Sequence, residues 1–521
     1  MMVKNLQPLA VKFSTPTWVH HNQLFQRHPR LQLLQEQCSK TFHNLKQLIS
    51  YVFVSGLHRN SFVMSRLLYT ALIELGDTNG VESEFGVRIF YQIRKPNIFS
   101  WNTMIRYFGA FGGLQSSGIA VRYYMEMLSH EMVPDRYTFP FLLQACGATS
   151  DLHLVEEVHC HVMKLGFHSD LFALNCLLNA YLVSGSTIEA WILFDEMADK
   201  DIISWTSLIS GLVSLSKDRE ALLVFKRLMV DECVPCPNIA TMVSTMSACG
   251  NLGSVTLMKC MHSLLEKAGW VESDTSVVNS LIDAYAKCGN LCYAKEVFDN
   301  VEDMKRDLYS WTAIISGFAI HGRGLDCLNL FSRMEQAGRF TPDSVTFLVI
   351  LLACSHSGLV EEGLRIFESM TTRYRIKPSL RHYGCIVDLL GRAGMLEQAH
   401  NIVENMPVEP NLAILGSLLS ACRLQNNLEL GEAVIRKIDL LKEKGGSTVI
   451  LSNMYANENE WNKVTLIRKE MRGVMQEKPP GRSLIVVKDV VHEFVAGNKI
   501  THQEMELQIS LEALENLTKS Q

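Results

Sequence analysis

The sequence predicts an all-α fold, a solenoid of tandem helical hairpins that are each about 35 residues long. Three observations predict it. Short sequence motifs recur at a nearly constant spacing along the chain, and this spacing divides into three units. Each unit contains two amphipathic stretches on either side of a glycine turn. A chain of 521 residues is also too long for one ordinary compact core, so either several domains or a repeat array is expected.

A tryptophan-containing motif defines the spacing. It occurs three times, as Ser100-Trp101-Asn102, Ser204-Trp205-Thr206 and Ser310-Trp311-Thr312, so the tryptophans are 104 and then 106 residues apart. A cysteine phrase keeps nearly the same interval, at residues 145–147, 248–250 and 353–355. Pairs of an aromatic and an apolar residue, such as Phe194/Met197 and Phe225/Leu228, lie 31 to 36 residues apart where successive units carry them. The interval therefore contains three units.

Each unit predicts two helices. In residues 275–307 apolar side chains recur twice at helical spacing, first at Val278, Leu281, Ile282 and Tyr285 and then at Leu291, Ala294, Val297 and Phe298. The turn Cys288-Gly289-Asn290 separates the two stripes. Such a hairpin cannot bury its own stripes, so it must stack on its neighbours. The first helices then line the inner face, where such arrays bind extended ligands.

Composition limits the possible functions. The chain is 47% apolar and 20% charged, as folded proteins are, and no run of 18 apolar residues predicts a membrane span. A net charge of −5 gives no basic footprint of the kind typical of nucleic-acid-binding proteins. Fourteen cysteines without a secretory signal favour a reducing compartment.

Residues 1–30 have the character of an organellar transit peptide. The segment contains Lys4, Lys12, Arg27 and Arg30 together with several hydroxyl residues, and no acidic residue precedes Glu36. A short basic tail that arose by chance is the alternative.

Segments at three different positions of the repeating pattern resemble plant pentatricopeptide-repeat proteins of the PLS type, in which long, short and standard units alternate. Residues 136–146 resemble the opening of a long unit, residues 283–289 a short unit and residues 310–317 a standard unit. The resemblance runs from about residue 31 to the end and implies a right-handed α-solenoid. One partial and ten complete repeats are expected within 31–411, the complete ones at 61–97, 98–135, 136–170, 171–201, 202–238, 239–274, 275–307, 308–343, 344–379 and 380–411.

The C-terminal residues resemble the E motifs of the same family. Residues 412–446 resemble the first E motif and residues 447–487 the second, both interpreted as helical hairpins. Residues 480–483 and 491–497 resemble the start of the DYW deaminase domain, so residues 488–521 are interpreted as a truncated E+ segment. The resemblance thus implies a short β-hairpin-like segment after the helices.

The sequence predicts no enzyme. A zinc deaminase needs a ligand histidine, a glutamate two residues later and a downstream pair of cysteines. His502 and Glu504 have the first spacing, but no cysteine follows them. Cys233 and Cys236 form a C-x-x-C upstream, and because two further zinc ligands are not identifiable, coincidence is the preferred explanation. We expect no catalytic residue, no metal and no cofactor.

Other residues that recur in phase are interpreted as packing residues. They are Cys146, Cys249, Cys354 and Cys422 at one helical position, His159 and His262 at another, and the three tryptophans, which are expected in the core or lining the groove.

The resemblance implies that each unit reads one RNA base. In the family, the fifth and last residues of a unit meet the edge of the base, and the second residue packs on its face. The fifth and last positions hold small hydrogen-bonding groups, at Ser65, Asn97, Asn102, Asp135, Asn175, Asp201, Thr206, Asn238, Asn279, Asp307, Thr312, Asp343 and Asn411. The second positions are apolar at Phe62, Phe99, Tyr137, Phe172, Ile203, Tyr309 and Val345, and depart from this at Ser276 and Arg381.

An alternative exists for the last positions, because Asn and Asp are also favoured as helix N-caps. It does not explain the fifth positions, which lie inside the first helix, where Asn and Thr are mediocre helix formers.

The family's code implies a target. Fifth/last pairs Ser/Asn and Thr/Asn favour adenine, Asn/Asp favours uracil and Thr/Asp favours guanine. Pro140, Val243 and Leu348 occupy the fifth position of the long units and cannot bond a base edge, and Gly384/Asn411 is uninformative. The implied string is 5′-AUNUANUGNN-3′, with the edited cytidine four nucleotides beyond the base under the last unit.

The expected function is sequence-specific binding of single-stranded RNA in a mitochondrion or chloroplast, the mitochondrion being slightly favoured. The protein would specify a C-to-U editing site and recruit a DYW-type deaminase and accessory editing factors, with no membrane insertion and no small-molecule substrate. One alternative is a role in RNA stability, splicing or translation without editing. Another is a peptide-binding scaffold like tetratricopeptide arrays, but repeating Lys/Arg carboxylate clamps are not found.

Overall fold

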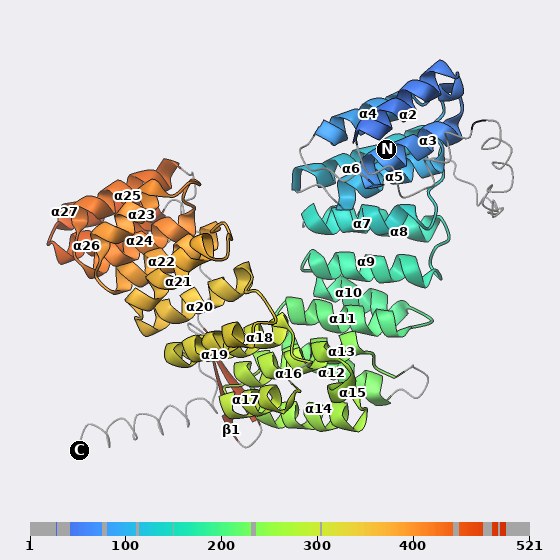
Figure 1. Ribbon diagram of the computed structural model, residues 1–521. Helices are drawn as coiled ribbons and strands as arrows, with labels where there is room; N and C mark the ends of the chain where they lie inside the picture. The colour runs from blue at the N-terminus through green and yellow to red at the C-terminus, as the bar shows by residue number, and fades with distance from the viewer. Residues whose placement is uncertain are drawn as a thin grey trace. The chain divides into compact units, whose positions relative to one another are not determined.

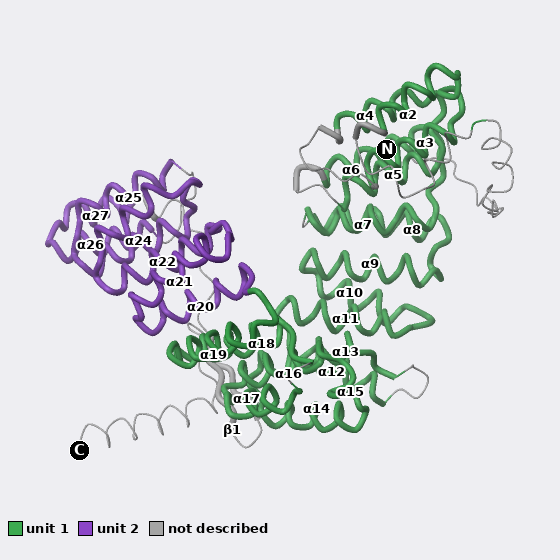
Figure 2. The backbone as a smooth tube through the Cα atoms, viewed as in Figure 1, with its two compact units in different colours: residues 1–341 green, residues 342–521 purple. Residues whose placement is uncertain are grey.

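Helical hairpins make up most of the computed structural model (Figure 1), which describes residues 28, 42–74, 81–110, 114–149, 151–230, 236–302, 305–440, 447–472, 482–487 and 490–495. The chain divides into an N-terminal part, residues 1–341, and a C-terminal part, residues 342–521 (Figure 2). Nearly all of the predicted transit peptide, residues 1–30, lies outside the described residues, as do Cys233 and His502.

The described residues of the N-terminal part form eight hairpins in succession. Their first helices are α3 (Ser61–Tyr69), α5 (Ile98–Ala110), α7 (Thr138–Thr149), α9 (Leu171–Val183), α11 (Ile202–Ser214), α13 (Ile239–Asn251), α16 (Thr275–Lys287) and α18 (Leu308–Ile320). Their second helices are α4 (Val81–Gln92), α6 (Leu114–Ser129), α8 (Leu152–Lys164), α10 (Thr187–Glu196), α12 (Asp218–Val230), α14 (Val255–Lys267), α17 (Leu291–Asn300) and α19 (Gly324–Ala337). Four more helical elements are α2 (Phe42–Val54), η2 (Leu57–Arg59), η3 (Thr70–Glu74) and α15 (Trp270–Ser273).

These helices form two layers (Figure 1). Each first helix from α3 to α16 contacts the first helix of the next hairpin, so the first helices form one continuous row. From α6 to α17, each second helix contacts the first helix of its own hairpin and that of the following one. The core lies between the layers, and the solenoid predicted from the repeats is confirmed.

The hairpin of α16 and α17 shows how the sequence builds one repeat. Gly289 turns the chain at a φ of +80°, a left-handed conformation that other residues rarely adopt. The next residue, Asn290, caps α17 by accepting a hydrogen bond from the backbone N–H of Tyr293 at 3.2 Å. All the predicted stripe residues are buried except Leu291, which is half-buried at the start of α17.

The repeated tryptophans belong to the core. Each lies edge-to-face against a phenylalanine near the end of the preceding second helix, with ring centroids 4.8 to 4.9 Å apart, in the pairs Phe90/Trp101, Phe194/Trp205 and Phe298/Trp311. The repeated cysteines are buried as well, and burial raises the pKa of the Cys146 thiol to about 12 and that of Cys354 to about 11. Such thiols stay protonated, which suits packing rather than metal binding.

The two repeated histidines join neighbouring hairpins. Nδ1 of His159 lies 2.8 Å from the hydroxyl of Tyr181, and Nδ1 of His262 lies 3.1 Å from that of Tyr285. Burial lowers the pKa of both imidazoles below the ordinary value, so both are neutral hydrogen-bonding groups at neutral pH.

The described residues of the C-terminal part form helical hairpins too, and two strands follow them. Its helices are α20 (Ser344–Ser357), α21 (Val360–Thr372), α22 (Leu380–Arg392), α23 (Leu396–Asn405), α24 (Leu412–Leu424), α25 (Leu428–Leu440), α26 (Ser447–Asn457) and α27 (Trp461–Arg472). Strands β1 (Arg482–Val487) and β2 (Val490–Val495) pair antiparallel, with Arg482 opposite Val495. The short β-hairpin expected after the helices is present.

The helices are also too short or too polar to cross a bilayer throughout the part of the chain that the structure describes.

Candidate nucleic-acid interface

The second residue of most hairpins is a large apolar side chain that faces solvent at the start of the first helix. Phe172 is 46% exposed and Tyr309 is 72% exposed, although burying such side chains stabilises a fold by about 25 cal/mol for each Å². The other exposed members are Phe99, Tyr137, Ile203 and Val345, and Phe62 is half-buried. Exposed apolar groups that recur at one position of a row are characteristic of a surface that a ligand covers.

The last residue of each repeat caps the next first helix, as the alternative interpretation proposed. Asp201 accepts from the backbone N–H of Ser204 at 2.8 Å, and Asn238 accepts from that of Thr241 at 2.8 Å. The same bond is made by Asn97, Asp135, Asp307, Asp343 and Asn411. Capping uses Oδ1, so the second Oδ or Nδ atom remains for other contacts.

The fifth and last residues of one repeat are brought together by this arrangement. Nδ2 donates to Oδ1 of the aspartate in each Asn/Asp pair, at 2.9 Å in Asn102/Asp135 and at 3.2 Å in Asn175/Asp201 and Asn279/Asp307. In Ser65/Asn97 the amide Nδ2 lies 3.4 Å from the serine Oγ. Residues about 30 positions apart in the sequence thus form one polar pair at the start of the first helices.

Three predicted site residues bond to the backbone of the helix that they belong to or begin. Ser65 is fully buried, and its Oγ donates to the backbone oxygen of Ser61 at 2.6 Å. Thr312, in the N-terminal part, donates to the backbone oxygen of Leu308 at 2.9 Å, and Asp343 caps α20 in the C-terminal part. The roles of all the predicted site residues in base recognition stay predictions.

The carboxylate of Asp201 is held ionised. Burial raises its pKa, but hydrogen bonds from the backbone and hydroxyl of Ser204 and from the amide of Asn175 outweigh burial and lower the pKa below its ordinary value. An ionised aspartate accepts hydrogen bonds only, so this pair presents an acceptor to any ligand.

Sequence reasoning missed a further set of residues at the same place. The third residue of most hairpins is a fully buried serine or threonine whose Oγ lies 2.8 to 3.1 Å from Oδ1 of the preceding last residue; the set is Ser100, Thr138, Ser204, Thr241, Ser310 and Thr346. A signal was available, because a hydroxyl residue follows each of these Asn or Asp residues by three positions.

Two arginines place positive charge on the row of first helices. The guanidinium of Arg66 lies 5.3 Å from the ring centroid of Phe99, and that of Arg106 lies 5.0 Å from Phe141 and 6.0 Å from Tyr69. Further along the row, charges are paired within one helix, as in Lys287 with Asp283 at 2.8 Å. An overall charge of −5 therefore still leaves cations and aromatic rings together on this face.

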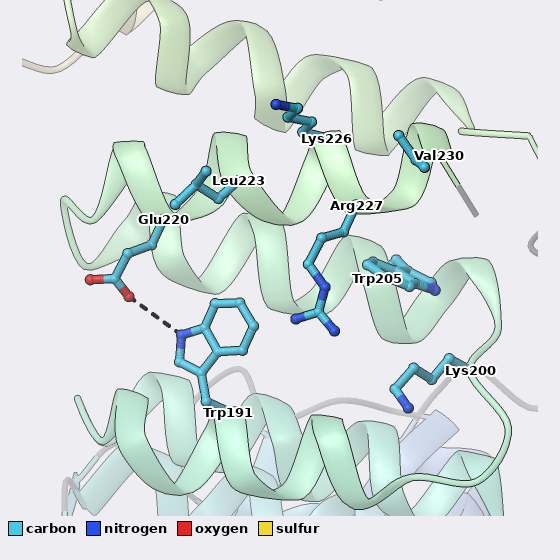
Figure 3. A pocket seen from close by; sticks show the side chains of 8 residues that line it. All are labelled: Trp191, Lys200, Trp205, Glu220, Leu223, Lys226, Arg227 and Val230. Atoms are coloured by element: carbon cyan, nitrogen blue, oxygen red, sulfur yellow. Dashed lines mark hydrogen bonds between the residues drawn. The ribbon is translucent and has the colours of Figure 1, made fainter. Parts of the chain in front are cut away.

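A pocket between α10 and α12 has a different character (Figure 3). Trp191 donates from Nε1 to Glu220 at 3.4 Å, and Arg227 lies over its ring and pairs with Asp195 at 3.3 Å. Lys200 donates to the backbone oxygen of Met197. Several polar groups of this pocket thus already have partners within the protein. The pocket is built largely on second helices, whereas the paired residues lie on or at the start of first helices.

No group of three or more His, Cys, Asp or Glu side chains is placed to hold a metal ion among the described residues. Neither Cys233 nor His502, the two starting points of the motifs considered from the sequence, belongs to those residues.

Comparisons with known proteins identify the repeat. The family model described as PPR repeat matches residues 172–202, 203–233, 276–305, 309–339 and 345–374, and the model described as E motif matches residues 425–486. A maize pentatricopeptide repeat protein, PPR10, has a solved structure that is 16% identical and gives a TM-score of 0.46, covering 89% of this chain and 77% of that one.

Curated relatives match over most of their length. A pentatricopeptide repeat-containing protein of Arabidopsis thaliana, named as chloroplastic/mitochondrial, is 35% identical over 506 residues, which is 95% of this chain and 78% of the relative. A second one from the same plant is 33% identical over 509 residues, 89% of this chain and 94% of the relative. With its matched repeats and E motif, the chain belongs to the pentatricopeptide repeat proteins, in the subgroup that carries an E motif.

Proposed function

We propose that the protein binds single-stranded RNA in a sequence-specific manner inside a plant organelle and specifies a site of C-to-U editing. The observation that carries the proposal is the recurring pair of fifth and last side chains beside an exposed apolar second residue. Stacking on the apolar residue would supply affinity, and hydrogen bonds to the base edge would supply specificity.

Membership of the family supports the rest of the proposal. A member of the family from Arabidopsis thaliana is named as chloroplastic/mitochondrial, which favours a mitochondrion or chloroplast as the location of this protein. The E motif favours editing, because it accompanies that role in the family. The protein acts as a specificity subunit, and a separate DYW-type deaminase and accessory editing factors supply the chemistry.

Sequencing organellar transcripts from a plant line without this protein tests the editing role. We expect one cytidine to remain unconverted, four nucleotides beyond a stretch that matches 5′-AUNUANUGNN-3′. If all editing sites are converted normally while a transcript changes in abundance, splicing or translation, the role without editing replaces this one.

The purified protein alone is expected not to deaminate RNA that contains its target cytidine. That reaction needs a zinc-bound water and a glutamate that shuttles protons. The measurement is conversion of the cytidine in a labelled RNA, with and without added zinc. Zinc-dependent conversion by the isolated protein would contradict the assignment as a specificity subunit.

A further inference from the structure

The hydroxyl groups of the third residues differ in their hydrogen-bond partners, and the difference depends on whether the residue is serine or threonine. Serine occupies the third position at Ser100, Ser204 and Ser310, and threonine at Thr138, Thr241 and Thr346. Among the described residues, the side-chain hydrogen bonds of these serines go to the last residue of the preceding repeat alone, as from Ser204 to Asp201 at 2.8 Å. Thr138 and Thr241 contact both the last residue and the fifth residue of that repeat.

The Asn102 amide is held at both ends, at Oδ1 by Thr138 and at Nδ2 by Asp135. Its Oγ1 lies 2.8 Å from Oδ1 of Asn102 and 3.1 Å from Oδ1 of Asp135, so its one proton has the shorter path to the asparagine. Nδ2 of Asn102 donates to Asp135 at 2.9 Å. With oxygen and nitrogen both engaged, the amide has one orientation, and its second N–H is the group left to meet a base.

Asn175 and Asn279 lack this support. Their Nδ2 atoms donate to Asp201 and Asp307 at 3.2 Å, but their Oδ1 atoms are buried and have no hydrogen-bond partner among the described residues. The serine that follows in each case is bonded to the aspartate instead. A buried acceptor that lacks a donor is unfavourable, so these amides are held less firmly than that of Asn102.

Thr241 bonds to both members of the preceding Thr206/Asn238 pair. Its Oγ1 lies 2.7 Å from Oγ1 of Thr206 and 2.8 Å from Oδ1 of Asn238, so one hydroxyl joins both residues of the preceding Thr/Asn pair. The link therefore does not depend on an asparagine at the fifth position.

We propose that the third-residue threonine is a positioning residue for base recognition by the preceding repeat, and that serine at this place supports only the last residue. The proposal rests on the proposed function, since it concerns how firmly the base-reading pair is held. It assigns stronger discrimination to the pair Asn102/Asp135 than to the chemically identical pairs Asn175/Asp201 and Asn279/Asp307.

The variant Thr138→Val tests this, because it removes the hydroxyl and keeps the shape of the side chain. We measure affinity for four RNAs that differ only at the second base of 5′-AUNUANUGNN-3′, and for four that differ only at the fourth. The preference for uracil at the second base is expected to fall about fivefold, the factor for one net hydrogen bond. The preference at the fourth base, read by Asn175, stays unchanged.

Ser204→Ala is the matched control. It removes a hydroxyl that also contacts a capping aspartate, but one that does not contact the fifth residue Asn175. It is expected to lower the uracil preference at the fourth base by less than Thr138→Val lowers that at the second. An equal loss of preference in Ser204→Ala, or a Thr138→Val protein that binds all eight RNAs equally more weakly, would show that the hydroxyl only stabilises the helix cap.

Two outcomes separate this inference from the proposed function. If the unaltered protein shows no base preference at either position, the proposed RNA recognition is wrong. If it shows the preference and Thr138→Val keeps it, only the positioning role is wrong. Should Thr138→Val not fold, Ser204→Thr provides the converse test, with a stronger uracil preference at the fourth base expected and an unchanged preference contradicting the proposal.

Discussion

Removing residues 447–521 is expected to abolish editing of the target cytidine while leaving RNA affinity largely intact. The residues predicted to read bases end at Asn411, which caps α24, whereas α26 and α27 lie beyond them. On the proposed function, this C-terminal segment attracts the deaminase, so its loss separates binding from chemistry. The measurements are the fraction of converted cytidine in a complemented plant line and the affinity of the purified variant for its RNA.

The truncation needs a control for the surface that it uncovers. Leu451, Tyr455 and Val464 of the removed hairpin pack against Leu428 and Ile435 of α25. A second truncated protein with Leu428→Gln and Ile435→Gln keeps the exposed face polar. Equal loss of RNA binding and editing in both truncated proteins would mean that reading and recruitment are not divided at this point of the chain.

The architecture could be predicted from the sequence because every repeat carries the same pattern of core residues. The Phe90/Trp101 contact recurs as Phe194/Trp205 and Phe298/Trp311, so one local pattern implies the whole row. Burial patterns at 3.6-residue spacing could also be predicted directly, and within residues 275–307 only Leu291 departs from its predicted burial.

The geometry of the base-reading pairs could not be predicted from the same patterns. The identity of Asp201 did not reveal that one carboxylate oxygen caps α11 and also accepts from Asn175. Nor did the difference between serine and threonine at the third position reveal which hydroxyl reaches the fifth residue. These contacts join residues from different hairpins, so they depend on how the hairpins stack and not on the spacing within one of them.

Exchanging one fifth residue is expected to change the base preferred at one position only. Asn175→Thr changes an Asn/Asp pair into a Thr/Asp pair, so the fourth base should shift from uracil towards guanine. Thr312→Asn makes the reverse change, and the eighth base should shift from guanine towards uracil. Each variant should bind the original RNA with a cost of roughly 1–3 kcal/mol, about five- to 150-fold in affinity, because each loses a matched base-edge contact.

Gel shifts on two sets of four RNAs, one varied at the fourth base and one at the eighth, measure the exchange. Each variant serves as the control for the other, since a correct register moves the preference in one set and leaves the second set unchanged. The structural basis is strongest for Asn175, whose amide already donates to Asp201 at 3.2 Å. An unchanged preference in both sets would mean that the assignment of fifth residues to bases is wrong, and a shift at a neighbouring base would mean that the register is displaced by one repeat.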